Sequence, residues 1–293
     1  MAAPDPLPSQ PRVGIVTVSF GSDSVLPGFL DSLGAASARS TSVVIADNRP
    51  DGSSGVEELT TAHGAVYLPL PINEGYGGGM NAAVAALPPS VEWVLVSNPD
   101  VILGRGSIDA LLATGDTDPA IGSVGPAILT SEGTLYPSAR SVPSLLTGVG
   151  HALFANLWVE NPWSRAYRRD SAEAPVRRDA GWLSGACFLV RRTAFDSLGG
   201  FDPGFFMYFE DVDLGYRLGR AGFRNVYEPV ATVVHSGAHS TTSESARMIE
   251  AHHDSARRFL FKRYPGALLW PVRTVLGIGL RVRSSLVRRR MRH

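Results

Sequence analysis

The chain has 293 residues, of which 44% are hydrophobic and 18% are charged, enough for one large α/β domain with a C-terminal appendage. This composition excludes fibrous and broadly disordered classes. The lone Cys187 cannot form an intramolecular disulfide, and the proline-rich start has no apolar signal-peptide core, so we expect an intracellular, reducing compartment. The sequence contains no run of about eighteen apolar residues, so we do not expect a transmembrane helix.

The formal net charge is zero, but the charge is unevenly distributed along the chain. None of the 27 acidic residues follows Asp254, whereas eleven of the 27 Arg and Lys residues do. Within residues 268–293 aliphatic residues alternate with arginines, a pattern typical of a helix on an anionic membrane surface. The alternative is a packing helix with a solvated end. Nucleic-acid binding is disfavoured, because aliphatics rather than base-stacking aromatics separate the basic residues.

In the first hundred residues, short apolar runs rich in β-formers alternate with helix-like stretches. The pattern predicts strands near 13–19, 42–46, 65–68 and 92–96, and helices near 24–38, 54–63 and 77–86. Such alternation is typical of a parallel sheet with helices on both faces. Ligands bind such sheets at the carboxyl ends of the strands, so the polar residues that follow each strand are the candidates for a site.

The region from residue 121 to 234 mixes further strands with irregular sequence. We expect strands at 121–129, 183–190 and 232–234, and a loop-rich insertion from 138 to 179. A helix-like pattern follows at 214–221. The second half therefore extends the same α/β architecture with less regular crossovers.

Polar and small residues end the first two predicted strands. Thr17 and Ser19 close the first strand, and Asp47 closes the second. An Asp at the end of a buried strand can accept hydrogen bonds from a base edge or a ribose, and small residues let a nucleotide approach the backbone. Each segment fits an ordinary strand-end turn equally well.

A glycine-rich run, from Asn73 to Asn81, enters the third predicted helix. Glycines at a loop-to-helix junction let backbone N–H groups surround a phosphate, and the two asparagines add polar contacts. The run lacks the Lys of a Walker loop and the spacing of a Rossmann fingerprint. A flexible linker is the alternative.

The fourth strand leads into Asn98-Pro99-Asp100. One carboxylate together with substrate phosphates commonly holds Mg²⁺ or Mn²⁺, which prefer oxygen ligands. Asp100 is therefore the candidate metal ligand.

An aromatic run at 205–209 ends in three carboxylates, Glu210, Asp211 and Asp213, just before the helix-like stretch. A helix N-terminus favours negative charge, so this junction can hold an ionised, half-shielded carboxylate that acts as a general base. The alternative is an acidic first turn with Asp211 as its N-cap.

These segments, together with those at 184–192 and 233–237, resemble the GT-A glycosyltransferases of family 2, in order over about residues 12–240. Asn98-Pro99-Asp100 is similar to the family's DxD motif, although Asn replaces the first Asp and leaves Asp100 as the main ligand. The resemblance implies a GT-A fold: a Rossmann-like mixed, mainly parallel α/β sheet flanked by helices, followed by C-terminal amphipathic helices.

The resemblance also implies domain limits. It predicts a disordered N-terminus at 1–11 and a catalytic domain at 12–240, divided into a nucleotide-sugar half at 12–100 and an acceptor half at 101–240. Residues 241–293 would then form a helical, basic, membrane-associating segment.

Roles for single residues follow from the same resemblance. Asp211 would deprotonate the acceptor hydroxyl with support from Glu210 and Asp213. Asp100 and His235 would hold Mg²⁺ or Mn²⁺, and His239 would reach the diphosphate. The implied nucleotide-sugar site comprises Thr17, Ser19, Asp47, Asn73, Gly75, Tyr76, Gly79, Asn81, Asn98 and Asp100. The implied acceptor site comprises Trp182, Gly185 and Tyr208.

Within family 2, the chain most resembles bacterial rhamnosyltransferases that build the cell-wall linker of arabinogalactan. This implies inverting transfer of L-rhamnose from a dTDP-sugar donor to a polyprenyl-diphospho-N-acetylglucosamine acceptor, at the cytoplasmic face of the cell membrane by a peripheral protein. Galactofuranosyl or other hexosyl transfer from a UDP-sugar remains an alternative, and so does a non-catalytic nucleotide-sugar-binding protein. A nucleotidyltransferase is disfavoured, because no Gly-rich loop with Arg or Lys follows the first strand.

Overall fold

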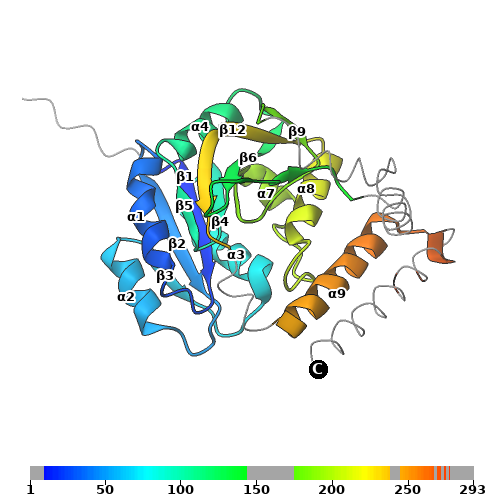
Figure 1. Cartoon of the computed structure of the whole chain (residues 1–293), viewed down its shortest axis with the longest axis horizontal. Helices are drawn as coiled ribbons and strands as arrows, with labels where there is room; N and C mark the ends of the chain where they lie inside the picture. The colour runs from blue at the N-terminus through cyan, green and yellow to red at the C-terminus, as the bar shows by residue number, and fades with distance from the viewer. Residues whose placement is uncertain are drawn as a thin grey trace, which may run out of the picture.

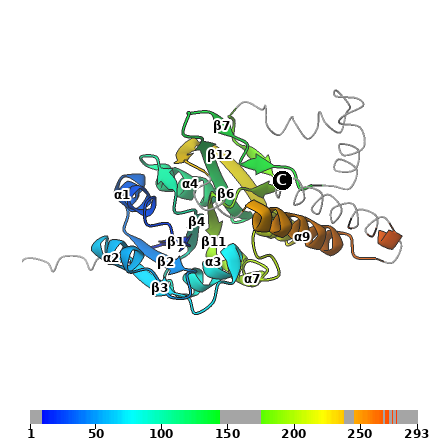
Figure 2. The ribbon, with the colours of Figure 1, turned by 60° about the horizontal axis from the view of Figure 1, so that its bottom comes forward.

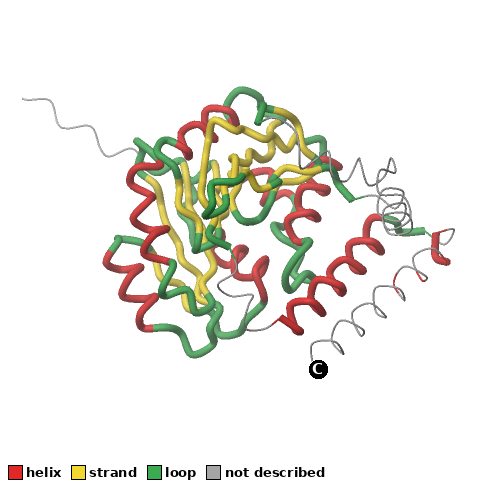
Figure 3. The backbone as a smooth tube through the Cα atoms, in the orientation of Figure 1, coloured by secondary structure: helices red, strands yellow, loops and turns green. Residues whose placement is uncertain are grey.

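The computed structural model describes residues 10–143, 175–237 and 245–266, together with 269–271, 274 and 277. In this part of the chain, a ten-stranded sheet forms the centre of the molecule, with helices packed around it (Figures 1 and 3). Its main path runs β3 (Val66–Pro69), β2 (Thr41–Asp47), β1 (Val13–Ser19), β4 (Trp93–Ser97), β11 (Cys187–Arg191), β6 (Ile121–Leu129), β12 (Arg224–His235) and β5 (Val101–Leu103). Strands β7 (Leu135–Tyr136) and β9 (Arg178–Ala180) pair with β6 and β12, and β8 (Ala139–Arg140) pairs with β10 (Trp182–Leu183).

Strand direction decides which residues share an edge of this sheet. Strands β1, β2, β3 and β4 are parallel, β11 is antiparallel to both β4 and β6, and β12 is parallel to β6. Two reversals restore the original direction, so β12 runs the same way as β1 and β4. The carboxyl ends of β1, β2, β4 and β12 therefore lie at one edge.

The two faces of the sheet bury two separate hydrophobic clusters. Along β1, Ile15 joins one cluster and Val16 the other, as the alternation of side chains in a strand requires. Helices α1 (Leu26–Ala36), α2 (Ser54–Ala62) and α4 (Ser107–Gly115) cover the first face, and α3 (Gly75–Ala85), α7 (Arg192–Ser197) and α8 (Glu210–Arg220) cover the second. This is the three-layer arrangement predicted from the alternating pattern.

A further helix, α9 (Ser245–Arg263), lies on the α8 side of the molecule, far from α1 and α2 (Figures 1 and 2). Its Phe259 packs with Phe205 and Val212 in a third, smaller apolar cluster. This cluster attaches α9 to the segment that leads into α8.

The structure confirms the predicted mixed α/β sheet and the strands of the first half, with boundaries shifted by one residue at most. The strand expected at 183–190 is instead two strands, β10 and β11, separated by a loop at 184–186. The strand expected at 232–234 is the end of the much longer β12. The pairing of β12 with β6 shifts register between Glu228 and Thr232. This irregularity breaks the alternation of apolar and polar residues from which the full length of the strand could have been predicted.

The glycine run predicted as a phosphate loop is the beginning of α3 itself. Gly75 has φ +80°, and a Cβ at this position would lie 1.9 Å from the carbonyl oxygen of Phe206. That carbonyl accepts a hydrogen bond from the N–H of Tyr76. Glycine is therefore required here because the loop before α8 packs directly on the α3 backbone.

We predict that Gly75→Ala destabilises the protein by at least about 1–3 kcal/mol, because the new methyl group adds a steric clash to a left-handed backbone. Gly34→Ala is the matched control: Gly34 is exposed in α1 and has no heavy atom near the added Cβ. Its substitution should stabilise the helix by about 0.5–1 kcal/mol. Urea denaturation of both variants measures the difference, and equal midpoints would contradict the packing constraint.

Candidate active site at the carboxyl edge of the sheet

Asp100 and His235 meet because β5 pairs with β12. Antiparallel pairing places His235 opposite Val101, the residue after Asp100. As a result, His235 Nε2 lies 3.1 Å from Asp100 Oδ1, with side chains that are 21% and 11% exposed. The backbone carbonyl of Asp100 also accepts hydrogen bonds from the N–H and hydroxyl of Ser236. Two residues 135 positions apart thus form one polar pair.

The donor set of this pair fits a divalent cation. His235 Nε2 lies within 3.2 Å of the Asn98 amide as well as close to the Asp100 carboxylate, so one ring nitrogen faces two polar groups. Carboxylate oxygen and imidazole nitrogen both bind Mn²⁺, and the carboxylate suits Mg²⁺. Among the described residues, no group of three or more His, Cys, Asp or Glu side chains is arranged so that it could hold a metal ion. Within the described part of the chain, Asp100 and His235 could supply two ligands.

Asp211 lies in the first turn of α8, where two backbone N–H groups bind its carboxylate. Gly185 N–H donates to Oδ2 at 2.8 Å, and Val212 N–H donates to Oδ1 at 2.8 Å. Burial raises the pKa of Asp211, and the hydrogen bonds oppose that shift by stabilising the charged form. The helix begins at Glu210 with Phe209 as its N-cap, so the alternative in which Asp211 caps the helix is wrong.

The loop at 184–186 connects the two groups of polar residues. The carbonyl of Ala186 accepts the N–H of Asn98 at 2.9 Å, and Gly185 binds Asp211 through its N–H and the Tyr76 hydroxyl through its carbonyl, the latter at 2.6 Å. One short loop therefore contacts the metal-candidate segment, the first turn of α8 and the first turn of α3.

Glu210 is buried beside Asp211 and differs from it in its surroundings. Burial, and to a lesser extent the charge of Asp211, raises the pKa of Glu210 to about 8. Its Oε2 atom is buried and has no hydrogen-bond partner in the described structure. Because N–H donors stabilise the charged form of Asp211, the proton of this pair belongs on Glu210 at neutral pH and Asp211 is ionised.

Tyr208 and Phe209 hold a strained backbone immediately before these carboxylates. Both have positive φ values, 67° and 66°, which are costly for residues with a Cβ. Their rings pack against His252 of α9 with centroid distances of 5.4 and 5.5 Å. Tyr208 is thus half-buried beside the site; its predicted contact with an acceptor stays a prediction.

The candidate nucleotide residues lie at the predicted strand ends but are enclosed. Thr17, Ser19 and Asp47 are each 0% exposed. The Asp47 carboxylate accepts hydrogen bonds from the Tyr67 hydroxyl at 3.0 Å and the Arg49 N–H at 3.1 Å. The Asp47 carboxylate therefore joins the loop after β2 to strand β3, and direct contact with a base stays a prediction.

The polar residues around the glycine run bind the protein itself. Asn73 Oδ1 accepts the N–H of Gly75 at 2.8 Å. The Asn81 amide makes two hydrogen bonds with the backbone of Phe201, each 2.9 Å, and a Cβ on Gly79 would clash with Val18. These contacts hold α3 against β1 and the loop before α8, and the predicted donor contacts of this run are untested.

Asp213 takes part in a buried ion-pair network that the sequence did not reveal. Its carboxylate is 0% exposed and lies 2.6 Å from Arg217 Nε and 2.7 Å from Lys262 Nζ. The i, i+4 spacing of Asp213 and Arg217 is a readable signal. The contact with Lys262, 49 positions away on α9, leaves no local signal.

Some of the remaining predicted features lie within the described structure and others lie outside it. Trp182 donates its indole N–H to the Ser141 carbonyl at 3.2 Å and packs against Gly215 of α8. His239, most of the insertion at 138–179 and most of the segment at 268–293 lie outside the described residues. Of the helices in the described part, none is long and apolar enough to cross a membrane.

Comparison with known proteins connects this geometry with sugar transfer. Residues 11–253 match the family described as glycosyltransferase like family 2. The N-acetylglucosaminyl-diphospho-decaprenol L-rhamnosyltransferase of Mycobacterium tuberculosis is 44% identical over 293 residues, which cover 95% of this chain and 95% of the relative. Rhamnosyltransferase WbbL of Escherichia coli K12 is 24% identical over 265 residues, or 86% of this chain and 93% of WbbL.

A solved structure shares the fold. The mannosyltransferase PcManGT from Pyrobaculum calidifontis, in complex with GDP-Man and Mn²⁺, has a TM-score of 0.58 over 91% of this chain and 69% of its own. At 13% identity this likeness concerns the fold alone. It confirms the predicted GT-A architecture.

We predict that Glu210→Gln changes how stability depends on pH. With a folded pKa of about 8 against a usual value of 4.5, Glu210 is neutral when the protein is most stable, and the wild type loses this contribution as pH rises from about 4.5 through 8. Glutamine cannot ionise, so the variant should match the wild type near pH 5 and exceed its free energy of unfolding near pH 9. Urea denaturation at both pH values measures this, and parallel pH dependence would contradict the assignment.

Proposed function

The chain belongs to glycosyltransferase-like family 2, and from this premise we propose that it transfers L-rhamnose from dTDP-L-rhamnose to N-acetylglucosaminyl-diphospho-polyprenol, with inversion at the anomeric carbon. The observation that carries the proposal is the loop at 184–186, which binds Asp211 on one side and the Asn98 segment beside Asp100 and His235 on the other. The relative's name supplies the sugar and the acceptor.

In this reaction Asp211 acts as the general base. Its carboxylate removes the proton of the acceptor hydroxyl as that oxygen attacks the sugar, so no covalent intermediate with the enzyme is needed. The raised pKa makes Asp211 a stronger base than an exposed aspartate, and the N–H groups of Gly185 and Val212 fix its orientation. Protonated Glu210 beside it adds no competing negative charge.

Asp100 and His235 are proposed to hold Mg²⁺ or Mn²⁺ on the donor side of the site. A divalent cation bound there would offset the negative charge that develops on the departing nucleoside diphosphate. His235 Nε2 also lies 3.2 Å from the Asn98 amide, and a cation bound at Nε2 would replace that contact. Diphosphate oxygens of the donor would supply further ligands to such a cation.

The acceptor contacts and the membrane-binding segment are proposed from the sequence. Trp182, Gly185 and Tyr208 border the path to Asp211, and residues 268–293 place the protein at the cytoplasmic face of the membrane, where a polyprenyl-linked acceptor is found. The enzyme is then peripheral, attracted by anionic lipids through the arginines of that segment.

A panel of donors tests the reaction directly. The purified full chain should release dTDP from dTDP-L-rhamnose when a polyprenyl-diphospho-N-acetylglucosamine acceptor and Mn²⁺ are present. UDP-galactofuranose and UDP-hexoses should react at least about 10²-fold more slowly, since hydrogen-bonded sites discriminate strongly against wrong substrates. Preferential turnover of a UDP-sugar would replace the donor assignment, and binding without turnover of any donor would favour a non-catalytic protein.

Separate roles for the two carboxylates give a paired prediction. Asp211→Asn should lower the transfer rate by about 10²–10⁴-fold, because the base is lost, while nucleotide affinity in the presence of Mn²⁺ changes little. Asp100→Asn should instead weaken Mn²⁺-dependent nucleotide binding. Calorimetric titration of dTDP with and without Mn²⁺, combined with the transfer assay, distinguishes the two. Normal turnover by Asp211→Asn would exclude Asp211 as the base.

A further inference from the structure

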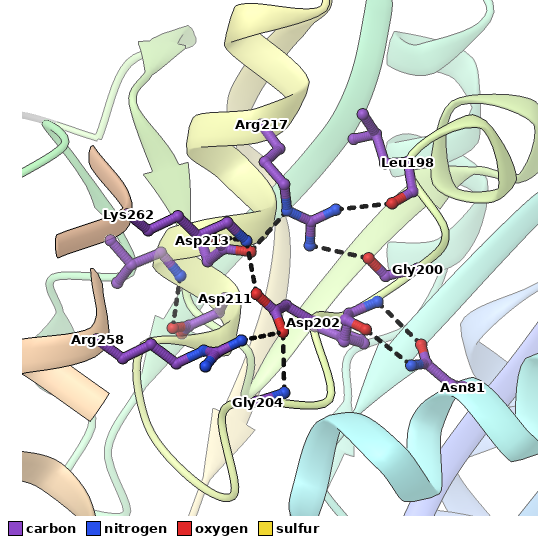
Figure 4. Close-up of polar contacts among 12 residues, drawn as sticks. Asn81, Leu198, Gly200, Asp202, Gly204, Asp211, Asp213, Arg217, Arg258 and Lys262 are labelled. Carbon is purple, nitrogen blue, oxygen red and sulfur yellow. Dashed lines mark hydrogen bonds and ion pairs between the residues drawn. The ribbon is translucent and has the colours of Figure 1, made fainter. Parts of the chain in front are cut away.

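Helix α9 contacts the candidate catalytic helix through a compact charged network (Figure 4). Lys262 Nζ lies 2.7 Å from Asp202 Oδ2 and 2.7 Å from Asp213 Oδ1, so one ammonium bridges two carboxylates from different segments. Arg258, one turn earlier on α9, binds Asp202 Oδ1 at 2.9 Å. The network joins α9, the loop at 198–204 and α8.

Lys262 is the single lysine of the chain; the other 26 basic residues are arginines. An ammonium group is a compact charge with three donors, whereas a guanidinium is a wide planar fork. A single ammonium nitrogen 2.7 Å from an oxygen of each carboxylate is a contact that suits the compact group. Residue choice at this position therefore matches the geometry of a two-carboxylate bridge.

Both carboxylates are tightly bound. Burial alone would raise the pKa of Asp202, but hydrogen bonds from Lys262, Gly204 N–H and Arg258 outweigh burial and lower it to about 2. Asp213 is fully buried, and its second partner, Arg217, also donates to the carbonyls of Leu198 and Gly200 at 3.1 and 2.8 Å. The network thus pairs each of the two carboxylates with two basic side chains.

The network holds the turn of α8 that carries the base. Asp213 follows Asp211 by two residues, and in a helix such residues point to different sides. On one side Asp211 binds Gly185, and on the other Asp213 binds Lys262 and Arg217. The first turn of α8 is therefore fixed from two directions.

α9 also supports the strained segment that precedes this turn. Ser255 donates its hydroxyl to the carbonyl of Met207 at 2.9 Å, and Phe259 packs against Phe209. Because Tyr208 and Phe209 hold unfavourable positive φ values, contacts from outside must maintain their conformation. Lys262 adds ion pairs with Asp202 and Asp213, which lie on either side of this segment in the sequence.

We propose that Lys262 is a positioning residue for the transfer reaction: its bridge between Asp202 and Asp213 holds the first turn of α8 so that the Asp211 carboxylate stays at Gly185. This inference rests on the proposed function of Asp211 as base. Lys262 touches neither donor nor acceptor in this arrangement; it acts through α8. Its loss should therefore lower kcat and leave donor affinity unchanged.

The test replaces Lys262 and then restores its charge. Lys262→Met and Lys262→Cys should reduce kcat by about 10- to 100-fold, as expected for a small misplacement of a catalytic group, with little change in dTDP affinity. Alkylation of the Lys262→Cys variant with bromoethylamine rebuilds an ammonium at nearly the original length and should recover most of kcat. Cys187 will not interfere, because burial raises the pKa of its thiol to about 12.

Arg257→Met is the matched control. Arg257 also belongs to α9 and also carries one positive charge, but its ion-pair partner is Asp254 at 4.0 Å rather than Asp202 or Asp213. This variant should keep the wild-type kcat. Urea denaturation of all variants identifies any that fail to fold, and the alkylated sample then serves as the folded comparison.

Amide hydrogen exchange separates this inference from the proposed function. Exchange at residues 210–213 should be faster in Lys262→Met than in Arg257→Met, a result that needs no turnover. Unchanged exchange with unchanged kcat would overturn the positioning role while Asp211 remains the base. If the wild type transfers no sugar, the proposed function fails, and the exchange data alone decide whether Lys262 holds α8; equal exchange in the two variants would then refute it.

Discussion

The reversed strand β11 is the constraint on which the site depends. Because it pairs antiparallel with both β4 and β6, β12 regains the direction of β4 and brings His235 to the carboxyl edge. The same reversal makes β11 begin at that edge, so the loop before it, which contains Gly185, lies beside the Asn98 segment. A parallel strand in this place would put the loop at the opposite edge and separate Asp211 from Asp100 and His235.

Neighbouring carboxylates take different charge states because their partners differ. Asp211 receives two N–H donors and is ionised, Glu210 is buried with an unpartnered oxygen and keeps its proton, and Asp213 is balanced by two cations. Three ionised groups within four residues would repel one another in a site of low polarity. The surroundings remove this repulsion by neutralising one group and pairing another, which leaves a single free base.

Sequence patterns predicted the features that depend on neighbouring residues in the chain. The alternating strands and the polar residues at their ends were readable, and with them the edge at which Asp100 and His235 meet. The helix expected at 77–86 begins two residues earlier, at Gly75, where the approach of the Phe206 carbonyl requires glycine, and no local pattern reveals that contact. The predicted donor contacts of the glycine run stay a prediction. The contact between Lys262 and Asp213 was unreadable because it depends on where α9 docks, which no local pattern specifies. The burial of Asp47 has the same origin: its partner, Tyr67, comes from another strand.

The docking of α9 also changes the meaning of the C-terminal charge. From sequence, all eleven basic residues after Asp254 fall in the segment 241–293 that was predicted to associate with the membrane. In the structure, Arg258 and Lys262 neutralise carboxylates of the body, and Arg263 donates to the Pro143 carbonyl while its guanidinium lies over the Tyr216 ring. These three charges are used within the fold, so the predicted attraction to anionic lipids would depend on the remaining eight, Arg257 and the seven arginines from Arg273 onward. In the sequence, a helix whose cations are proposed to support the turn that carries Asp211 is therefore followed by a segment whose cations are predicted to meet the membrane.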